Sequence, residues 1–117
     1  MKIIREEKNG IMCVTVKGRM EAQLSPELER TIEAILKNGQ TRLLFDLSAL
    51  EYLRSSVLRV ILSAVKTLNR RKGRVVLCCL NGYVSEIFEV NRFKDIITIT
   101  DSIESGFKAF SCEFKAA

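Results

Sequence analysis

Apolar residues recur along this chain in two different periods, one typical of strands and one typical of helices. The runs from Lys2 to Glu6 and from Ile11 to Lys17 predict two strands, joined by a tight turn at Asn9 and Gly10, a dipeptide that accepts positive φ. Further apolar runs predict strands over residues 42–46, 74–80 and 96–100. Stripes with a helical period predict helices over residues 25–37, 55–71, 82–90 and 102–110. The last of these helices is expected to be capped by Asp101, with Glu104 three residues further on.

This order of elements indicates an α/β fold with a mixed β-sheet of about four to five strands and four helices packed on it. The 117 residues, 47% of them apolar, predict a single compact domain over residues 1–117, with fraying expected from about Cys112 to Ala117. Because few elements are available to cover both faces of the sheet, we expect one face to be partly exposed.

A pair of serines marks the point where a buried strand and an apolar helix meet. Leu43, Leu44 and Phe45 form the strand, and Ser55 and Ser56 stand where serine caps helices. Unpaired backbone N–H groups and the positive end of the helix dipole favour a phosphate at such a position. The pair is therefore either a simple helix cap or a place for a phosphorylation switch.

The helix after the serines carries more apolar side chains than one packed face requires. Val57 lies on the main apolar stripe, whereas Val60 falls beside it. Val60 therefore belongs either to an exposed apolar binding patch next to the serines or to a position covered by a neighbouring loop. The predicted partner-binding residues at this helix start are Arg54, Ser55, Ser56, Val57, Arg59 and Val60.

Composition argues against catalysis and against a metal centre. The chain has no histidine and no nucleophile elbow, P-loop or dinucleotide-binding glycine motif, so we predict neither an enzyme nor a cofactor. We expect Asp46 to stabilise the exit from its strand through local backbone hydrogen bonds. The four cysteines show no zinc-ligand spacing and are expected to be reduced, with Cys13, Cys78 and Cys79 acting as small apolar residues in strands.

The net charge of +5 comes partly from a basic cluster at the end of the second helix, comprising Lys66, Arg70, Arg71, Lys72 and Arg74. No aromatic residue is interleaved for base stacking, and cations suit a helix C-terminus, so we predict no direct nucleic-acid binding. The cluster could instead steer an acidic protein partner. No apolar run is long enough to span a membrane, and the charged N-terminus is unlike a secretory signal, so we expect a cytoplasmic protein without membrane insertion.

Nearly the whole chain resembles the STAS domain of bacterial anti-sigma-factor antagonists. The residues that carry the resemblance are Gly18 and Glu21; Pro26, Glu27 and Leu28; Asp46, Leu47 and Ser48; Arg54, Ser55, Ser56, Val57 and Leu58; and Asp101 and Ser102. The chain departs from the family pattern in having Arg54 where an aspartate is usual, and Val57 and Arg92 where glycines are usual. Arg54 reverses the charge that a partner would meet there, or it pairs with a phosphate on Ser55 and damps its effect.

The resemblance implies a STAS-like fold and a non-enzymatic antagonist that binds an anti-sigma factor and so releases a sigma factor for transcription. It implies that the anti-sigma factor is also a serine kinase, and that phosphorylation of Ser55 ends the binding. A weak homodimer is a further expectation. The alternative is an unphosphorylated scaffold subunit of a larger complex, either of the stressosome type or the cytoplasmic partner of a phospholipid-transport ABC complex. A ligand-binding STAS module is a third reading, for which the sequence shows no pocket-lining pattern.

Overall fold

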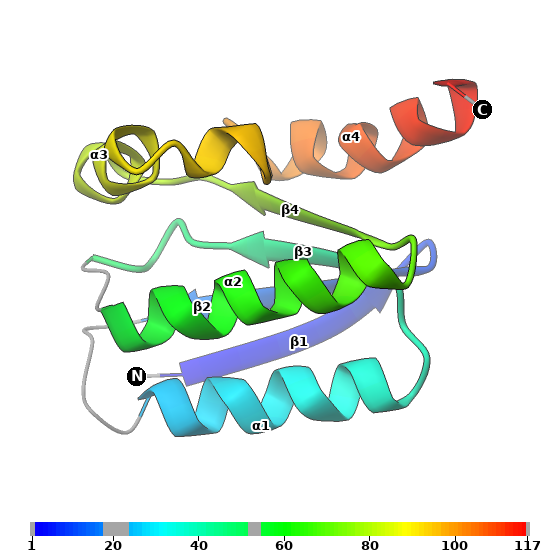
Figure 1. The fold of residues 1–117 in the computed structure, drawn as a ribbon, viewed down its shortest axis with the longest axis horizontal. Helices are drawn as coiled ribbons and strands as arrows, with labels where there is room; N and C mark the ends of the chain where they lie inside the picture. Colours follow the sequence, from blue (N-terminus) through cyan, green and yellow to red (C-terminus); the bar gives the residue numbers. More distant parts are fainter. Residues whose placement is uncertain (1, 18–23, 52–54, 117) are drawn as a thin grey trace.

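A computed structural model describes residues 2–17, 24–51 and 55–116 of the chain. Over these residues five strands and four α-helices confirm the predicted number and order of elements (Figure 1). The elements are β1 (Lys2–Lys8), β2 (Ile11–Lys17), α1 (Leu24–Lys37), β3 (Arg42–Asp46), α2 (Ser55–Arg70), β4 (Arg74–Cys78), α3 (Gly82–Val90), the short 3-10 helix η1 (Phe93–Asp95), β5 (Thr98–Thr100) and α4 (Ile103–Ala116).

The strands form one mixed sheet in the order β1-β2-β3-β4-β5. β1 and β2 are antiparallel, and Asn9 and Gly10 between them have φ of 55° and 77°, as the predicted turn requires. β2, β3, β4 and β5 are mutually parallel, with Leu44 of β3 opposite Val76 of β4 and Asp46 opposite Cys78. The carboxyl ends of β3 and β4 therefore lie side by side, and the chain leaves this edge toward α2 and α3.

The main core lies between one face of the sheet and the helices α1 and α2. Side chains that alternate along the parallel strands point into it, and Val84 and Phe88 of α3 extend it. Its fully buried large side chains include Leu28, Ile35, Leu43, Phe45, Leu47, Leu50, Ile61, Leu68 and Phe88.

Helix α4 covers part of the opposite face. Phe110 is buried there with Leu44, Val76 and Cys78, which alternate with the main-core residues along β3 and β4. The β1 side of this face remains open, and Ile4 is 37% exposed. This arrangement confirms the expectation that one face is only partly covered.

Two details of α4 differ from the sequence prediction. The helix continues past the predicted end at Phe110 to Ala116. Its start is capped by Ser102, whose Oγ accepts the Ser105 backbone N–H at 3.1 Å, and not by the predicted Asp101 with Glu104. A serine hydroxyl and an aspartate carboxylate are both good caps, so the backbone path decides which one is used.

Candidate protein-docking site

Helix α2 begins where the sequence predicted it. Ser55 is its first helical residue, and the side chain of the next residue, Ser56, is exposed. Arg54 lies outside the described residues. The first turn of α2 contains no acidic residue, so no side-chain carboxylate in that turn complements the positive end of the helix dipole.

Two of the predicted contact residues, Val57 and Val60, are apolar and lie largely inside the fold. Val57 is 1% exposed and Val60 is 8% exposed, and both belong to the main core. Val60 lies in the main core with Ile32 of α1, and both residues line the space between the two helices. The first turns of α2 therefore present polar side chains, Ser56 and Arg59, instead of an apolar patch.

A groove runs between α1 and α2 and includes Ser56 at the start of α2. Its volume is about 500 Å³, and its apolar side chains come from both helices. Glu29 and Glu33 of α1 and Arg59 of α2 are exposed at its edges. The residues that line it are Glu29, Ile32, Glu33, Leu36, Ser56, Arg59, Val60, Ser63, Ala64 and Thr67.

Sequence reasoning found the α2 side of this groove and missed the α1 side. Glu29 and Glu33 lie four positions apart on a helix, and such residues share one face. Nothing in their spacing indicates which other helix they face. Their position at the edge of the groove follows only from the contact between α1 and α2.

The segment before α2 is held by a residue from another part of the chain. Asn81 donates from Nδ2 to the backbone oxygen of Leu50 at 3.0 Å, and its Oδ1 accepts the Val84 backbone N–H at 2.8 Å. One side chain thus caps α3 and fixes the approach to α2. The contact ties the chain at Leu50, after β3, to Asn81, after β4.

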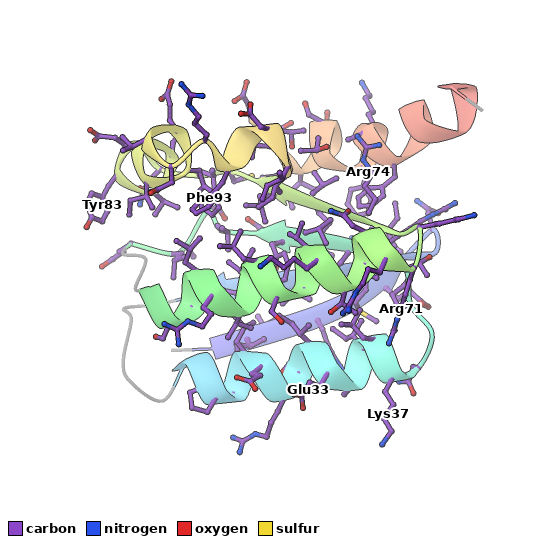
Figure 2. The ribbon with its side chains drawn as sticks, viewed as in Figure 1. Glu33, Lys37, Arg71, Arg74, Tyr83 and Phe93 are labelled. Carbon is purple, nitrogen blue, oxygen red and sulfur yellow. The ribbon has the colours of Figure 1, made fainter. Side chains whose placement is uncertain are left out.

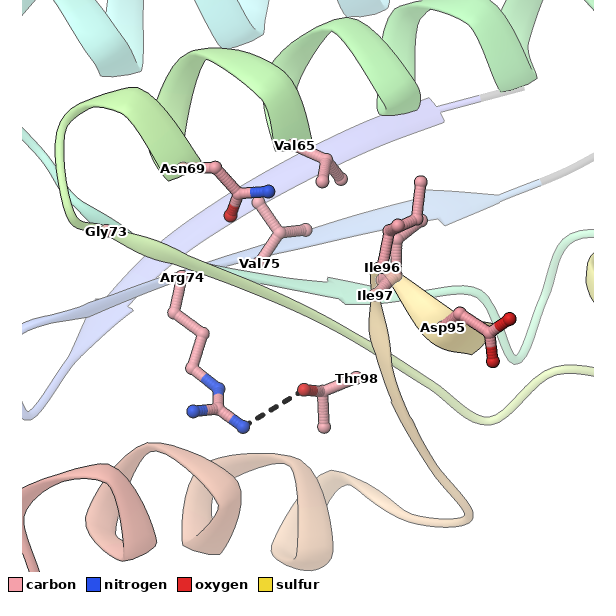
Figure 3. Close-up of a pocket in the computed structure, with 9 residues that line it drawn as sticks. All are labelled: Val65, Asn69, Gly73, Arg74, Val75, Asp95, Ile96, Ile97 and Thr98. Atoms are coloured by element: carbon pink, nitrogen blue, oxygen red, sulfur yellow. Dashed lines mark hydrogen bonds between the residues drawn. The ribbon is translucent and has the colours of Figure 1, made fainter. Parts of the chain in front are cut away.

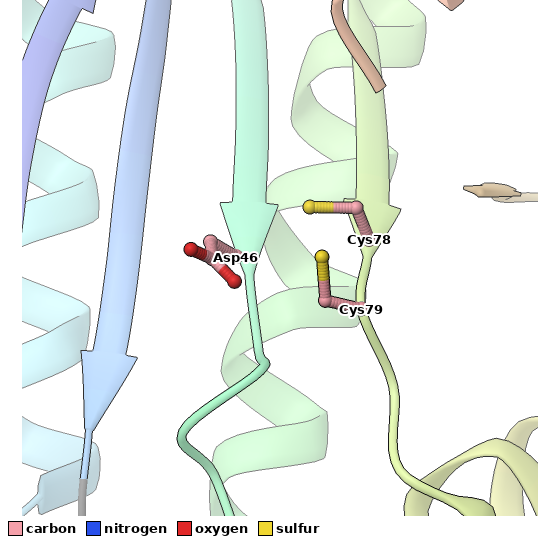
Figure 4. Close-up of side chains that lie close together, drawn as sticks. All are labelled: Asp46, Cys78 and Cys79. Carbon is pink, nitrogen blue, oxygen red and sulfur yellow. The ribbon is translucent and has the colours of Figure 1, made fainter. Parts of the chain in front are cut away.

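Asp46, Cys78 and Cys79 converge at the same edge of the sheet (Figure 4). One Asp46 carboxylate oxygen and the two Sγ atoms all lie within 4.8 Å of one another. Asp46 Oδ1 accepts the Ser48 backbone N–H at 3.0 Å, which confirms its predicted role at the strand exit. Cys79 has φ of 65°, and this left-handed backbone ends the strand at Cys78.

The thiols at this edge are free, and the thiolate form of Cys78 is disfavoured. Burial raises the pKa of Cys78 above its ordinary value, and the neighbouring Cys79 and the Asp46 carboxylate add to the effect. Burial, followed by the charge of Asp46, also raises the pKa of Cys13. Cys13, Cys78 and Cys79 are all unbridged, as predicted.

The basic cluster at the C-terminal end of α2 has structural contacts. Arg71 donates from Nη1 to the Leu36 backbone oxygen at 2.9 Å, so it satisfies a carbonyl in the last turn of α1 (Figure 2). Arg74 donates from Nη2 to Thr98 Oγ1 at 3.0 Å beside a pocket of about 330 Å³ (Figure 3). Two residues of the cluster, Arg71 and Arg74, therefore contact other elements of the fold.

The family model and the curated relatives of this chain agree on one family. The STAS domain family model matches residues 2–106. BtrV of Bordetella bronchiseptica, assigned as an anti-sigma factor antagonist, is 32% identical over 110 residues, covering 94% of this chain and 95% of that protein. The anti-sigma-B factor antagonist of Listeria monocytogenes is 28% identical over 96 residues, covering 82% of this chain and 84% of that protein.

Solved structures with the same fold are more distant in sequence. A Thermotoga maritima protein assigned as an anti-sigma factor antagonist superposes with a TM-score of 0.86 at 17% identity, with 92% of each chain covered. SpoIIAA of Bacillus in its phosphorylated form superposes with a TM-score of 0.77 at 14% identity, covering 93% of this chain and 99% of that one.

The fold and the extent of the family match place this protein in a defined class. The chain belongs to the STAS domain family. Among the described residues, no helix has the length and apolarity needed to cross a lipid bilayer.

Proposed function

We propose that this protein is an anti-sigma factor antagonist that works in the cytoplasm and binds its anti-sigma factor through the start of α2 and the adjoining α1–α2 groove. The relatives named as antagonists at 32% and 28% identity support the role. The observation that supports this surface is the exposed polar start of α2, where Ser56 and Arg59 border a groove with an apolar floor. Apolar floors with charged rims are typical of protein interfaces.

The proposed switch is phosphorylation of Ser55 by an anti-sigma factor that is also a serine kinase. A phosphate adds about −1.5 to −2 charges and three acceptor oxygens. At the N-terminus of α2 these charges lie at the positive end of the helix dipole, so the domain keeps its fold. The same charges must be desolvated when a partner covers them, which weakens the complex.

Mass spectrometry after incubation with the cognate kinase and ATP tests the modified residue. We expect one phosphate, located on Ser55, and no transfer to the Ser55→Ala variant. The affinity of the phosphorylated protein for the kinase domain should fall by more than about tenfold. A tenfold loss corresponds to about 1.4 kcal/mol of binding free energy.

A matched control variant shows whether a negative charge weakens binding only at Ser55 or anywhere on the surface. Ser105 is exposed in the first turn of α4. Ser55→Asp should weaken binding, and Ser105→Asp should bind as the wild type does. Absence of phosphate on Ser55, together with efficient binding by Ser55→Asp, would show that Ser55 is not a phosphorylation switch.

A pull-down from the source cell tests the partner. Recovery of a kinase-like ATPase protein together with a sigma factor supports the antagonist. Recovery of a transport ATPase with its permease would instead assign the chain to a transport complex.

A further inference from the structure

The three side chains at the carboxyl ends of β3 and β4 form a constellation that the proposed function does not use. The parallel register places Asp46 opposite Cys78, and the left-handed backbone at Cys79 follows directly. In a regular strand successive side chains point to opposite faces, whereas here both sulfur atoms lie near the Asp46 carboxylate (Figure 4). Two sulfurs and one oxygen within 4.8 Å of one another are a candidate ligand set.

We propose that Asp46, Cys78 and Cys79 bind a thiophilic divalent cation, with Zn²⁺ as the ion whose chemistry fits best. Zn²⁺ is held by cysteine sulfur at about 2.3 Å and by carboxylate oxygen at about 2.0–2.2 Å, usually in tetrahedral geometry. These bond lengths place neighbouring ligand atoms of one site roughly 3.3–3.8 Å apart. The observed spread of up to 4.8 Å therefore closes with small side-chain rotations.

The proposed site is closed on the side of Cys78 and open to solvent on the other. Cys78 is fully buried beneath α4, while Asp46 and Cys79 are half-buried. The ion can therefore enter from the side of the carboxylate and the second thiol, and a water molecule would occupy the fourth position.

Binding must release protons from the thiols. Each coordinated cysteine goes from SH to S⁻, so two protons leave to solvent as one divalent ion enters. The carboxylate contributes a third negative charge, and the complex carries a net charge of −1. The ion supplies the compensating charge that lets two adjacent sulfurs ionise beside Asp46.

The ion would connect two chain segments that lead to functional parts of the domain. Leu47 already donates its backbone N–H to the Cys78 oxygen at 3.1 Å at this point. The segment after Asp46 leads to α2, and the segment after Cys79 leads to the Asn81 cap of α3. A ligand that binds only the folded protein raises its stability by mass action, so the melting temperature should rise with added Zn²⁺.

Titration of the reduced full chain with Cd²⁺ tests the site, because Cd²⁺ binds thiolates and gives a sulfur-to-metal charge-transfer absorption. We expect saturation at one equivalent, and Zn²⁺ in excess should compete with Cd²⁺ for the site. Cys79→Ser and Asp46→Asn should each weaken binding by more than about tenfold. Both residues are half-buried, so these variants are expected to fold, which circular dichroism checks.

Matched controls are the other thiols. Cys13 lies on β2 outside the constellation, and Cys112 lies in α4. Cys13→Ser and Cys112→Ser should bind Cd²⁺ as the wild type does. Unchanged binding by Cys79→Ser, or no saturable binding in the micromolar range, would overturn the site. Ser55→Ala should bind the ion normally, so failure of the metal site leaves the proposed antagonist role intact.

Discussion

The side-chain amide of Asn81 donates to the backbone oxygen of Leu50 at 3.0 Å, across the gap between the ends of β3 and β4. Leu50 is itself 1% exposed, so its carbonyl lies near the core. A buried carbonyl without a partner costs free energy, and this contact avoids that cost. The position of the chain at Leu50 therefore depends on Asn81, the residue that caps α3.

We expect Asn81→Ala to lower the free energy of unfolding by about 2 kcal/mol, because it removes the α3 cap and leaves the Leu50 carbonyl unpaired. Urea denaturation measures this change. Asn81→Asp keeps the cap acceptor and loses only the donor, so its loss should be smaller. Equal stability of Asn81→Ala and the wild type would show that neither contact matters.

The turn between α2 and β4 requires glycine at position 73, because there is no room for a Cβ atom there. A Cβ added there would lie inside the contact distance of the Thr41 backbone oxygen, and 3.1 Å from Leu68 Cδ2. That oxygen also accepts the Arg74 backbone N–H at 2.8 Å, so it cannot move without breaking a sheet contact.

Gly73→Ala should therefore destabilise the protein by about 1–3 kcal/mol, as overpacking does, and thermal melting measures the change. The control is Gly82→Ala at the first residue of α3, where a Cβ meets nothing within 4 Å. That variant should melt at or above the wild-type temperature, because alanine favours helix over glycine. A comparable loss in both variants would contradict the steric argument.

The element order was predictable because each strand and helix has its own local periodicity. The Asn9-Gly10 turn was predictable for the same reason, since its positive φ values are a local property of these residues. The cap of α4 was not, because Asp101 and Ser102 are both competent and the path of the backbone selects Ser102.

The candidate sites depend on contacts between residues that are distant in sequence, and local patterns do not predict these contacts. The burial of Val60 beside α1 is not predictable from α2 alone, because it depends on how the two helices pack. The proximity of Asp46 to the two cysteines is likewise not a local property, because the register of β3 against β4 brings them together. A search for polar residues at the carboxyl ends of neighbouring parallel strands would have found this cluster.

Stability should fall in alkaline solution because of Cys78. Its pKa is raised in the folded protein by burial, then by Cys79 and Asp46, while the unfolded chain has an ordinary thiol. Above about pH 9 the unfolded thiol loses its proton and the folded one keeps it, so ionisation favours unfolding. The stabilisation from the protonated Cys78 thiol is complete at pH values below its pKa in the unfolded chain. It is lost as the pH rises toward the pKa of Cys78 in the folded protein.

Urea denaturation under reducing conditions from pH 7 to higher pH measures this effect. The slope for one such thiol is at most about 1.4 kcal/mol per pH unit. Cys78→Ala should be less stable at pH 7 because of lost packing, yet its stability should fall less steeply above pH 9. Parallel curves for the two proteins would rule out Cys78 as the cause.

Two adjacent residues of α2 should affect different properties of the protein. Val60 is 8% exposed in the core and Arg59 is exposed at the groove edge. Val60→Ala should lower the free energy of unfolding by about 2 kcal/mol through lost burial, with little effect on partner affinity in the folded fraction. Arg59→Ala should change stability by less than about 0.5 kcal/mol.

Arg59→Ala should instead weaken binding to the anti-sigma factor, and the difference from wild type should shrink at high salt, because an exposed charge acts through screened electrostatics. Urea denaturation and calorimetric titration at two ionic strengths separate the two effects. If Val60→Ala weakened binding without loss of stability, Val60 would act at the interface despite its burial. That outcome would require α1 to move away from α2 when the partner binds, because Val60 is buried while the two helices are packed together.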